Sequence, residues 1–168
     1  MKNTLQKIVA SSMLTSLVCV ATMIIKVPSP LHGYINLGDC VILLSAFLLS
    51  PGYAFLAAGI GSALADVFLG YVAYAPATFV IKGIMALCTC LVIKTLSKKL
   101  RPTVARAIGG GLGEIIMIVG YLVFEGFLYG FIPSLANVPA NAVQGVVGLV
   151  VGLLLIMIFE KNKIFMSD

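Results

Sequence analysis

Residues 70–90 read GYVAYAPATFVIKGIMALCTC, an apolar stretch long enough to cross a membrane, with one charged side chain, Lys82. Lys82 lies six residues after Pro76, which at about 1.5 Å per helical residue places it roughly 9 Å inside the start of such a helix. Asp66 holds a similar place in the preceding apolar stretch, GSALADVFLG at residues 61–70. Charges inside a membrane cost about 2.5–3.5 kcal/mol each on insertion scales, and they persist where they face a protein interior. The two charges therefore indicate membrane helices around a polar interior.

The rest of the chain is equally apolar. Hydrophobic residues make up 61% of its 168 residues, charged residues 10%, and the mean hydropathy is +1.14. A soluble domain typically has about 25% charged residues, and a chain this apolar cannot present a surface to water. No polar stretch between the apolar runs is long enough for a soluble domain. The sequence therefore predicts an all-α integral membrane protein with a single transmembrane domain over residues 1–168.

The apolar runs give the number of helices. Crossing the hydrocarbon core takes about 20 apolar residues. The first run is too long for a signal peptide and is followed by no small-residue cleavage site, so it counts as a helix. The sequence predicts six transmembrane helices, the second of them short: residues 8–25, 37–50, 53–70, 76–96, 104–129 and 137–159.

The basic residues favour six helices over five. With six helices, nine of the eleven Lys and Arg residues lie on one side of the membrane, near the two termini and in the turn between the fourth and fifth helices. Fusing residues 37–50 with residues 53–70 would spread them over both sides. The positive-inside rule therefore predicts both termini in the cytoplasm. The net charge of +5 then serves topology and contact with lipid headgroups, and no nucleic-acid partner is predicted.

Asp66 and Lys82 lie at matching depth on consecutive predicted helices, so their side chains can meet. Two interpretations remain open. The pair is a structural salt bridge between the third and fourth helices, or one or both side chains line a polar pocket open to the outside.

More polar residues fall in the same outer third of the helices. Asn137, Asn141 and Gln144 form one stripe at the start of the last helix, and Tyr121 and Glu125 lie one turn apart on the fifth. A single buried amide usually makes a hydrogen bond between helices, whereas this many polar groups at one depth favour a ligand chamber. The candidate substrate-binding residues are Tyr34, Asn36, Asp39, Asp66, Tyr74, Thr78, Lys82, Tyr121, Glu125, Asn141 and Gln144.

Two acids have alternative roles. Glu114 shares a helix face with Glu125 but lies about 16 Å deeper. Glu114 is therefore a candidate proton-relay carboxylate. We expect no second acid at its depth, and this disfavours the relay role. Asp39 either contacts the ligand or caps the helix that it opens, because an Asp at a helix start satisfies free N–H groups.

Motifs for catalysis and energy use are absent from the sequence. It contains no GxxxxGK[ST] segment, no HExxH and no Ser–His or Cys–His pair placed for nucleophilic attack. Nor is there an inverted repeat with broken helices, which many secondary transporters have. We therefore predict no enzyme, no catalytic residue, no metal site and no cofactor. A binding subunit that takes its energy from partner proteins fits this profile.

Residues 33–83, GYINLGDCVILLSAFLLSPGYAFLAAGIGSALADVFLGYVAYAPATFVIKG, resemble the substrate-binding S components of energy-coupling factor (ECF) vitamin transporters. The similarity is to the group with riboflavin-type and pyridoxine or hydroxymethylpyrimidine-type members. It implies a six-helix S component in a bacterial cell membrane that captures a small water-soluble vitamin or precursor from outside. The implied partners are the lipid bilayer, a transmembrane coupling subunit and two cytoplasmic ATPase subunits.

The resemblance also implies where ligand and partners bind. Many family members have Ala-xxx-Ala pairs on the first helix for docking to the coupling subunit. This chain has Ala10-xxx-Leu14 and Ser11-xxx-Thr15 instead, which leaves the docking face open. Family binding sites lie on the outer side, between the first loop and the later helices, which here implies Tyr34, Asn36, Asp39, Lys82, Asn141 and Gln144.

The polar set suggests the class of cargo. Its acids and bases nearly balance, which suits a neutral or zwitterionic molecule with hydroxyl groups. Tyr34, Tyr71 and Tyr74 either stack on an aromatic ring or belong to an interfacial belt. A pyridoxine or hydroxymethylpyrimidine type of cargo is therefore favoured, with riboflavin next. The alternatives are a self-sufficient proton-coupled carrier or channel, with Glu114 and Glu125 as relay, and a structural subunit without a ligand.

Overall fold

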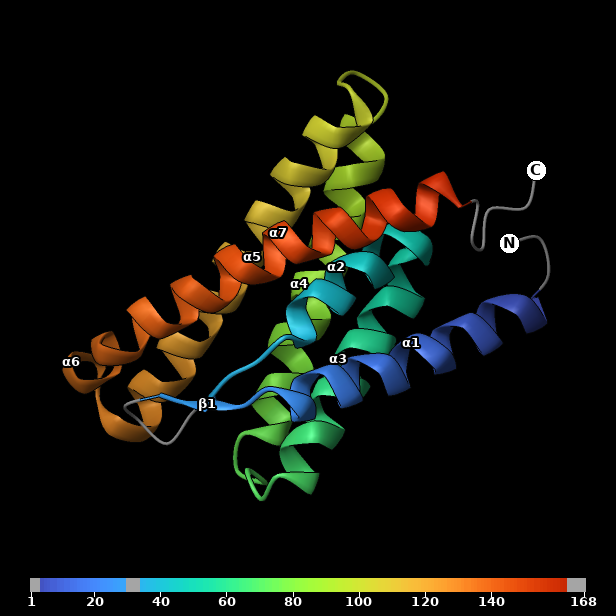
Figure 1. The fold of residues 1–168 in the computed structure, drawn as a ribbon. Coiled ribbons are helices and arrows are strands. Elements are labelled where there is room, and N and C mark those ends of the chain that lie inside the picture. The colour runs from blue at the N-terminus through green and yellow to red at the C-terminus, as the bar shows by residue number, and fades with distance from the viewer. Residues whose placement is uncertain (1–3, 30–33, 163–168) are drawn as a thin grey trace.

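The computed structural model of the chain describes residues 4–29 and 34–162. Its main helices are α1 (Thr4–Ile24), α2 (Gly38–Leu48), α3 (Pro51–Phe68), α4 (Ala75–Leu96), α5 (Pro102–Tyr129) and α7 (Val138–Lys161) (Figure 1). The smaller elements are the paired strands β1 (Val27–Pro28) and β2 (Tyr34–Ile35), the short helix α6 (Phe131–Ser134) and the 3-10 turn η1 (Leu135–Asn137). The predicted all-α fold with six helices is confirmed. Every helix boundary lies within four residues of the predicted one, with the largest difference at the start of α1.

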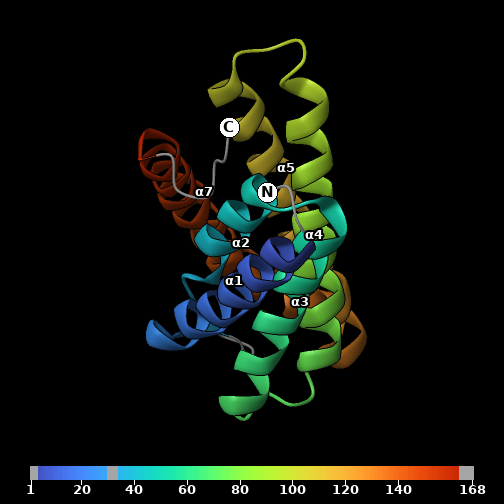
Figure 2. The same ribbon diagram turned by 90° about the vertical axis from the view of Figure 1, so that its right-hand side faces the viewer.

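Helix α2 differs from the other main helices because it is too short to cross a membrane. In the described part of the chain, five helices are long and apolar enough to do so, and α2, with 11 residues, is not. Eleven residues rise about 16 Å, roughly half of the hydrocarbon core. Nine of its residues are nevertheless buried, because α2 lies in the middle of the bundle and contacts α1, α3, α4 and α7 (Figures 1 and 2).

The two ends of the bundle differ in their connections. The α3–α4 and α4–α5 connections lie at opposite ends, at the bottom and the top of Figure 1. The start of α1 and the end of α7 both point to the right of that view, so the chain enters and leaves the bundle toward one side. This arrangement fits an even number of passes. That the basic α4–α5 turn and both termini face the cytoplasm stays a prediction.

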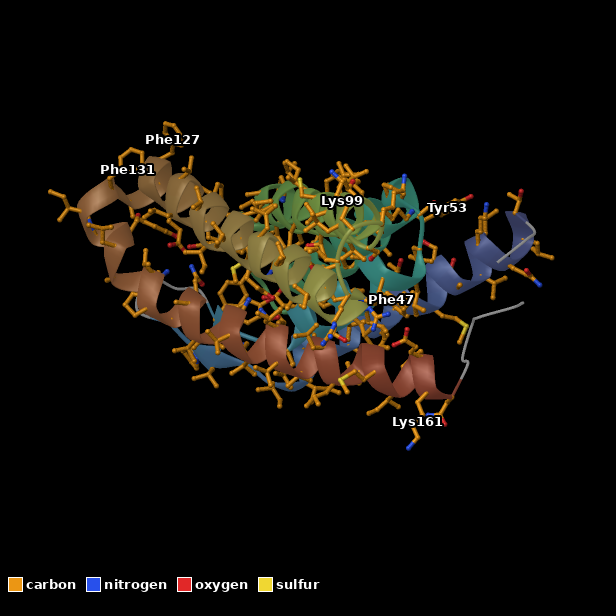
Figure 3. All side chains as sticks on the ribbon, turned by 90° about the horizontal axis from the view of Figure 1, so that it is seen from above. Phe47, Tyr53, Lys99, Phe127, Phe131 and Lys161 are labelled. Atoms are coloured by element: carbon orange, nitrogen blue, oxygen red, sulfur yellow. The ribbon has the colours of Figure 1, made fainter. Side chains whose placement is uncertain are left out.

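The outer surface of the bundle is apolar. Phe127 and Phe131 project outward at the α5–α6 turn (Figure 3) and are 79% and 54% exposed. Leu5 and Met13 on α1 are 72% and 58% exposed. Such contiguous apolar surface is costly in water and suits the hydrocarbon of a bilayer.

The small-residue pairs of α1 are divided between its two faces. Ala10, Ser11 and Leu14 are buried inside the bundle. Ser12 and Ser16 are exposed, and each hydroxyl donates to the carbonyl four residues earlier in the helix. The Ala10-xxx-Leu14 pair is therefore not available for docking, since its side chains pack against the chain's own helices.

Arg106 stands apart from the basic residues of the α4–α5 turn. It is 6% exposed and donates two hydrogen bonds to Glu160 of α7, at 2.8 and 2.6 Å. Its guanidinium also lies 4.6 Å from the ring centre of Phe47, which Figure 3 labels. The expected contact with lipid headgroups is therefore wrong for Arg106, which joins α5 to α7 and to the end of α2.

Glycine allows α3 to lie very close to α1, because small residues let the backbones of membrane helices approach each other. A Cβ at Gly61 would lie 2.5 Å from the backbone oxygen of Thr15 and 2.8 Å from the Cβ of Val18. The backbone of α1 cannot move aside as the end of a flexible side chain can. The close approach therefore depends on the missing side chain.

Replacing Gly61 with alanine is expected to destabilise the protein by about 1–3 kcal/mol, the usual cost of overpacking. Gly111→Ala on α5 is the matched control, because a Cβ there meets nothing within 4 Å and alanine is preferred to glycine in helices by about 1 kcal/mol. Thermal unfolding of the purified variants in detergent measures the difference. Equal midpoints for the two variants would contradict the close contact of α1 and α3.

Candidate functional site

A pocket opens between the β1–β2 hairpin and the helices, with about 480 Å³ of empty space that includes the solvent at its mouth. All of the predicted substrate-binding residues except Asp39 line it. The complete lining is Thr22, Ser29, Tyr34, Asn36, Ser62, Asp66, Tyr71, Tyr74, Thr78, Lys82, Tyr121, Glu125, Asn141 and Gln144.

Lys82 forms its ion pair with Asp39, and not with Asp66 as the depth argument had allowed. Asp39 is fully buried and Lys82 is 3% exposed. The salt-bridge interpretation of Asp66 and Lys82 is therefore wrong. The reason is that α2 starts inside the bundle, so its first turn lies at the depth of Lys82 and not at the membrane surface.

Asp39 also binds a second lining residue. The side-chain amide of Gln144 donates to Oδ2 of Asp39 at 2.6 Å, while Lys82 contacts Oδ1. Both carboxylate oxygens of Asp39 thus bind side chains and not the free N–H groups at the start of α2, so the capping interpretation of Asp39 is wrong. Asp39 lies behind the pocket and holds two side chains that line it.

Gln144 continues this network to the hairpin. Its Oε1 accepts hydrogen bonds from the backbone N–H of Asn36 at 2.9 Å and from the Asn36 side chain at 3.3 Å. The Asn36 side-chain oxygen accepts from the N–H of Gly38 at 2.9 Å. These bonds link α7, the end of β2 and the first turn of α2, which is why residues distant in sequence meet at the pocket.

Asp66 has a different partner, Tyr34 of the hairpin. The Tyr34 hydroxyl donates to Oδ1 of Asp66 at 2.6 Å. Burial, together with the neighbouring Asp66 carboxylate, raises the pKa of the Tyr34 phenol well above its usual value, so it stays a neutral donor. The Tyr121 hydroxyl similarly donates to Thr78 at 3.1 Å. One hydroxyl group thus joins the hairpin to α3, and another joins α5 to α4.

Glu125 is the second acid of the lining. It is 2% exposed and accepts a hydrogen bond of 2.8 Å from the side chain of Asn137. The predicted stripe of Asn137, Asn141 and Gln144 is therefore divided in its contacts. Asn137 binds the acid, and the other two side chains line the pocket.

Three tyrosines form a connected aromatic wall. The ring centres of Tyr34 and Tyr71 are 4.9 Å apart, and those of Tyr71 and Tyr74 are 6.4 Å apart. All three rings line the pocket. The structure brings them together where a ligand ring could stack, and the stacking itself stays a prediction.

Four lining residues were not on the list of substrate-binding candidates: Thr22, Ser29, Ser62 and Tyr71, of which Tyr71 was named only as a possible stacking residue. Ser62 lies one helical turn before Asp66, a spacing that carried a usable signal. Thr22 lies in the last turns of α1 and Ser29 directly after β1, and no local pattern indicates that they reach the pocket.

Glu114 lies outside the lining, next to Asp39. A Cβ at Gly148 of α7 would lie 2.8 Å from the Cβ of Asp39 and 3.0 Å from Oε1 of Glu114, so both acids border that glycine. Among the described residues neither carboxylate oxygen of Glu114 has a hydrogen-bond partner, and the residue is 5% exposed. The expectation that no second acid lies at its depth is therefore wrong, again because α2 begins inside the bundle.

The site offers hydrogen bonds, aromatic faces and charge. Within residues 4–29 and 34–162, no group of three or more His, Cys, Asp or Glu side chains is placed to hold a metal ion. The chemistry that the lining supports is reversible binding of a polar aromatic molecule.

Comparisons with known proteins bear on this site. The family model described as "ECF-type riboflavin transporter, S component" matches residues 2–161. A Pyrococcus woesei protein, "Uncharacterized protein in gap 3'region", is 38% identical over 136 residues, which are 80% of this chain and 88% of that protein. A solved structure reported as "Structure and mechanism of the S component of a bacterial ECF transporter" has a TM-score of 0.72. That match is 23% identical, covers 99% of this chain and 100% of the other, and shows the shared fold.

Proposed function

The chain belongs to the family of ECF-type riboflavin transporter S components, and from this premise we propose that its pocket captures a neutral, hydroxylated aromatic vitamin. It is a multi-pass membrane protein and a substrate-binding transporter subunit, not an enzyme. The observation that carries the proposal is the pocket lining, with its neutral hydrogen-bonding groups and connected tyrosines.

The charges of the lining favour a neutral cargo. Among the described lining residues Lys82 alone is basic, and it is paired with Asp39 behind the wall. Asp66 and Glu125 are acids. A phosphate or carboxylate on the ligand would therefore find no uncompensated positive charge, and it would lose its hydration on entry.

Riboflavin is the first cargo to test. The family takes its name from this vitamin. The tyrosine wall offers faces for a flat ring system, and the asparagine, glutamine, serine and threonine side chains offer partners for a chain of hydroxyl groups.

A pyridoxine or hydroxymethylpyrimidine cargo is the second candidate. The near balance of acids and bases in the sequence favoured this type of cargo. The observation in its support is that Asp66 and Glu125 both line the pocket and can accept hydrogen bonds from hydroxymethyl or ring N–H groups.

The proposed partners are a transmembrane coupling subunit and two cytoplasmic ATPase subunits. Membrane helices associate through small residues that allow close backbone contact. Ser12 and Ser16 provide such a surface on the exposed face of α1. We place the contact with the coupling subunit there.

Calorimetry on the purified chain tests the function. Riboflavin is expected to bind with a Kd below about 1 μM, equivalent to about −8.2 kcal/mol. At a hundredfold excess over Kd it should stabilise the protein by about 2.7 kcal/mol in thermal unfolding. Pyridoxine and hydroxymethylpyrimidine are measured in parallel. A lower Kd for either of them than for riboflavin would reverse the order of the candidates.

Transport by the reconstituted chain distinguishes the alternative function. Without ATPase partners, vesicles containing the chain should bind vitamin but not accumulate it. Accumulation that follows an imposed proton gradient would instead support a self-sufficient carrier. A folded chain that binds none of the three vitamins would contradict the proposed cargo class.

A further inference from the structure

We propose that Asp39, which does not line the pocket, determines its selectivity by neutralising Lys82 from behind, so that the pocket excludes the phosphate ester of its vitamin. The identity of the vitamin rests on the proposed function. The charge arrangement does not, because it follows from contacts among residues of the chain itself.

Asp39 contacts the pocket only through other side chains. It is fully buried, and its two carboxylate oxygens are both occupied, Oδ1 by Lys82 and Oδ2 by Gln144 at 2.6 Å. Lys82 and Gln144 are lining residues on two different helices, α4 and α7. Asp39 is therefore a positioning residue that fixes one wall of the pocket and its charge together.

The charge count of the wall depends on this pair. With Asp39 in place, the Lys82–Asp39 unit is neutral, and the remaining charged groups of the lining are the acids Asp66 and Glu125. Removing the Asp39 charge would leave Lys82 without its ion-pair partner, 5.5 Å from the ring centre of Tyr121, which also lines the pocket. At such distances, away from bulk water, one unit of charge changes the affinity of an anion by more than tenfold.

Glu114 is a second carboxylate beside this unit. It borders the same glycine as Asp39, Gly148, and its oxygens have no hydrogen-bond partner in the described residues. Glu114 could therefore take over Lys82 when Asp39 is changed. The variants must therefore remove the Asp39 charge both with and without the Glu114 charge.

A purely structural role for Asp39 predicts a different result. Loss of fold or wall geometry lowers the affinity for every ligand. The selectivity role predicts a change of opposite sign for an anionic ligand, whose affinity rises relative to that of the neutral vitamin. The ratio of the two affinities separates the two roles.

The experiment uses the full chain in detergent with D39N, D39N/E114Q and, as the matched control, D39N/K82M. Calorimetry measures riboflavin against riboflavin 5′-phosphate. The ratio of affinities is expected to shift at least tenfold toward the phosphate ester in D39N, or in D39N/E114Q where Glu114 takes over the lysine. The shift should vanish in D39N/K82M. An unchanged ratio in both D39N and D39N/E114Q would overturn the proposal.

Inorganic phosphate provides a second arm that needs no vitamin. Phosphate should raise the unfolding midpoint of D39N or D39N/E114Q, and leave wild type and D39N/K82M unchanged. If wild type binds no vitamin, the proposed cargo fails while this arm still decides the role of Asp39. Equal responses of all variants would overturn the proposal. So would Asn variants that cannot be recovered folded with or without phosphate, since Asp39 would then only hold the fold.

Discussion

Lys82→Met is expected to destabilise the protein by about 3–5 kcal/mol and to remove high-affinity vitamin binding. The substitution keeps the length of the apolar stem but removes the charge that faces Asp39. Asp39 is fully buried, and an uncompensated charge at such a site carries this cost. Thermal unfolding in detergent measures the loss of stability, and calorimetry measures the loss of binding.

The double variant K82M/D39N is the control for Lys82→Met. It removes both charges, and replacing a buried ion pair by neutral groups is often nearly neutral for stability. Most of the lost stability should therefore return. Binding should remain weak, because Lys82 lines the pocket. A single variant as stable as wild type would contradict the buried pair, since Asp39 would then need no counter-ion.

Gln144→Ala is expected to have the second largest effect, with a loss of binding of about a hundredfold, equivalent to about 2.7 kcal/mol. The side chain lines the pocket, donates to Asp39 and accepts from the backbone N–H of Asn36. Alanine leaves a buried carboxylate oxygen and a buried N–H unsatisfied, at about 1–3 kcal/mol each. Stability should therefore fall together with affinity, in the same calorimetric and unfolding measurements.

Asn141→Ala is the matched control for Gln144→Ala. Asn141 lies one turn earlier on α7 and also lines the pocket, but it makes none of the bonds that join Gln144 to Asp39 and Asn36. Its replacement should weaken binding while leaving the unfolding midpoint close to that of wild type. If both variants lose the same stability, the network through Gln144 is not what holds the hairpin and α2 together.

The sequence predicted the membrane class and the helix boundaries because both depend on local properties. Apolar run length gives the helices, and the rise of about 1.5 Å per residue gives the depth of each side chain along its own helix. This is also why the polar residues of α3, α4, α5 and α7 were placed at one level, where the structure shows them lining a common pocket. Depth along a helix needs no knowledge of its neighbours.

Which polar groups pair with each other was decided by the tertiary structure. The depth argument assumes that every helix begins at the membrane surface, and α2 does not, since its 11 residues start inside the bundle. Asp39 therefore meets Lys82 and lies beside Glu114, while Asp66 is left to Tyr34. Hydropathy cannot show this, because a buried short helix and the first half of a membrane span have the same apolar composition. Only the packing of α2 among α1, α3, α4 and α7 fixes its depth, and with it the charge of the pocket.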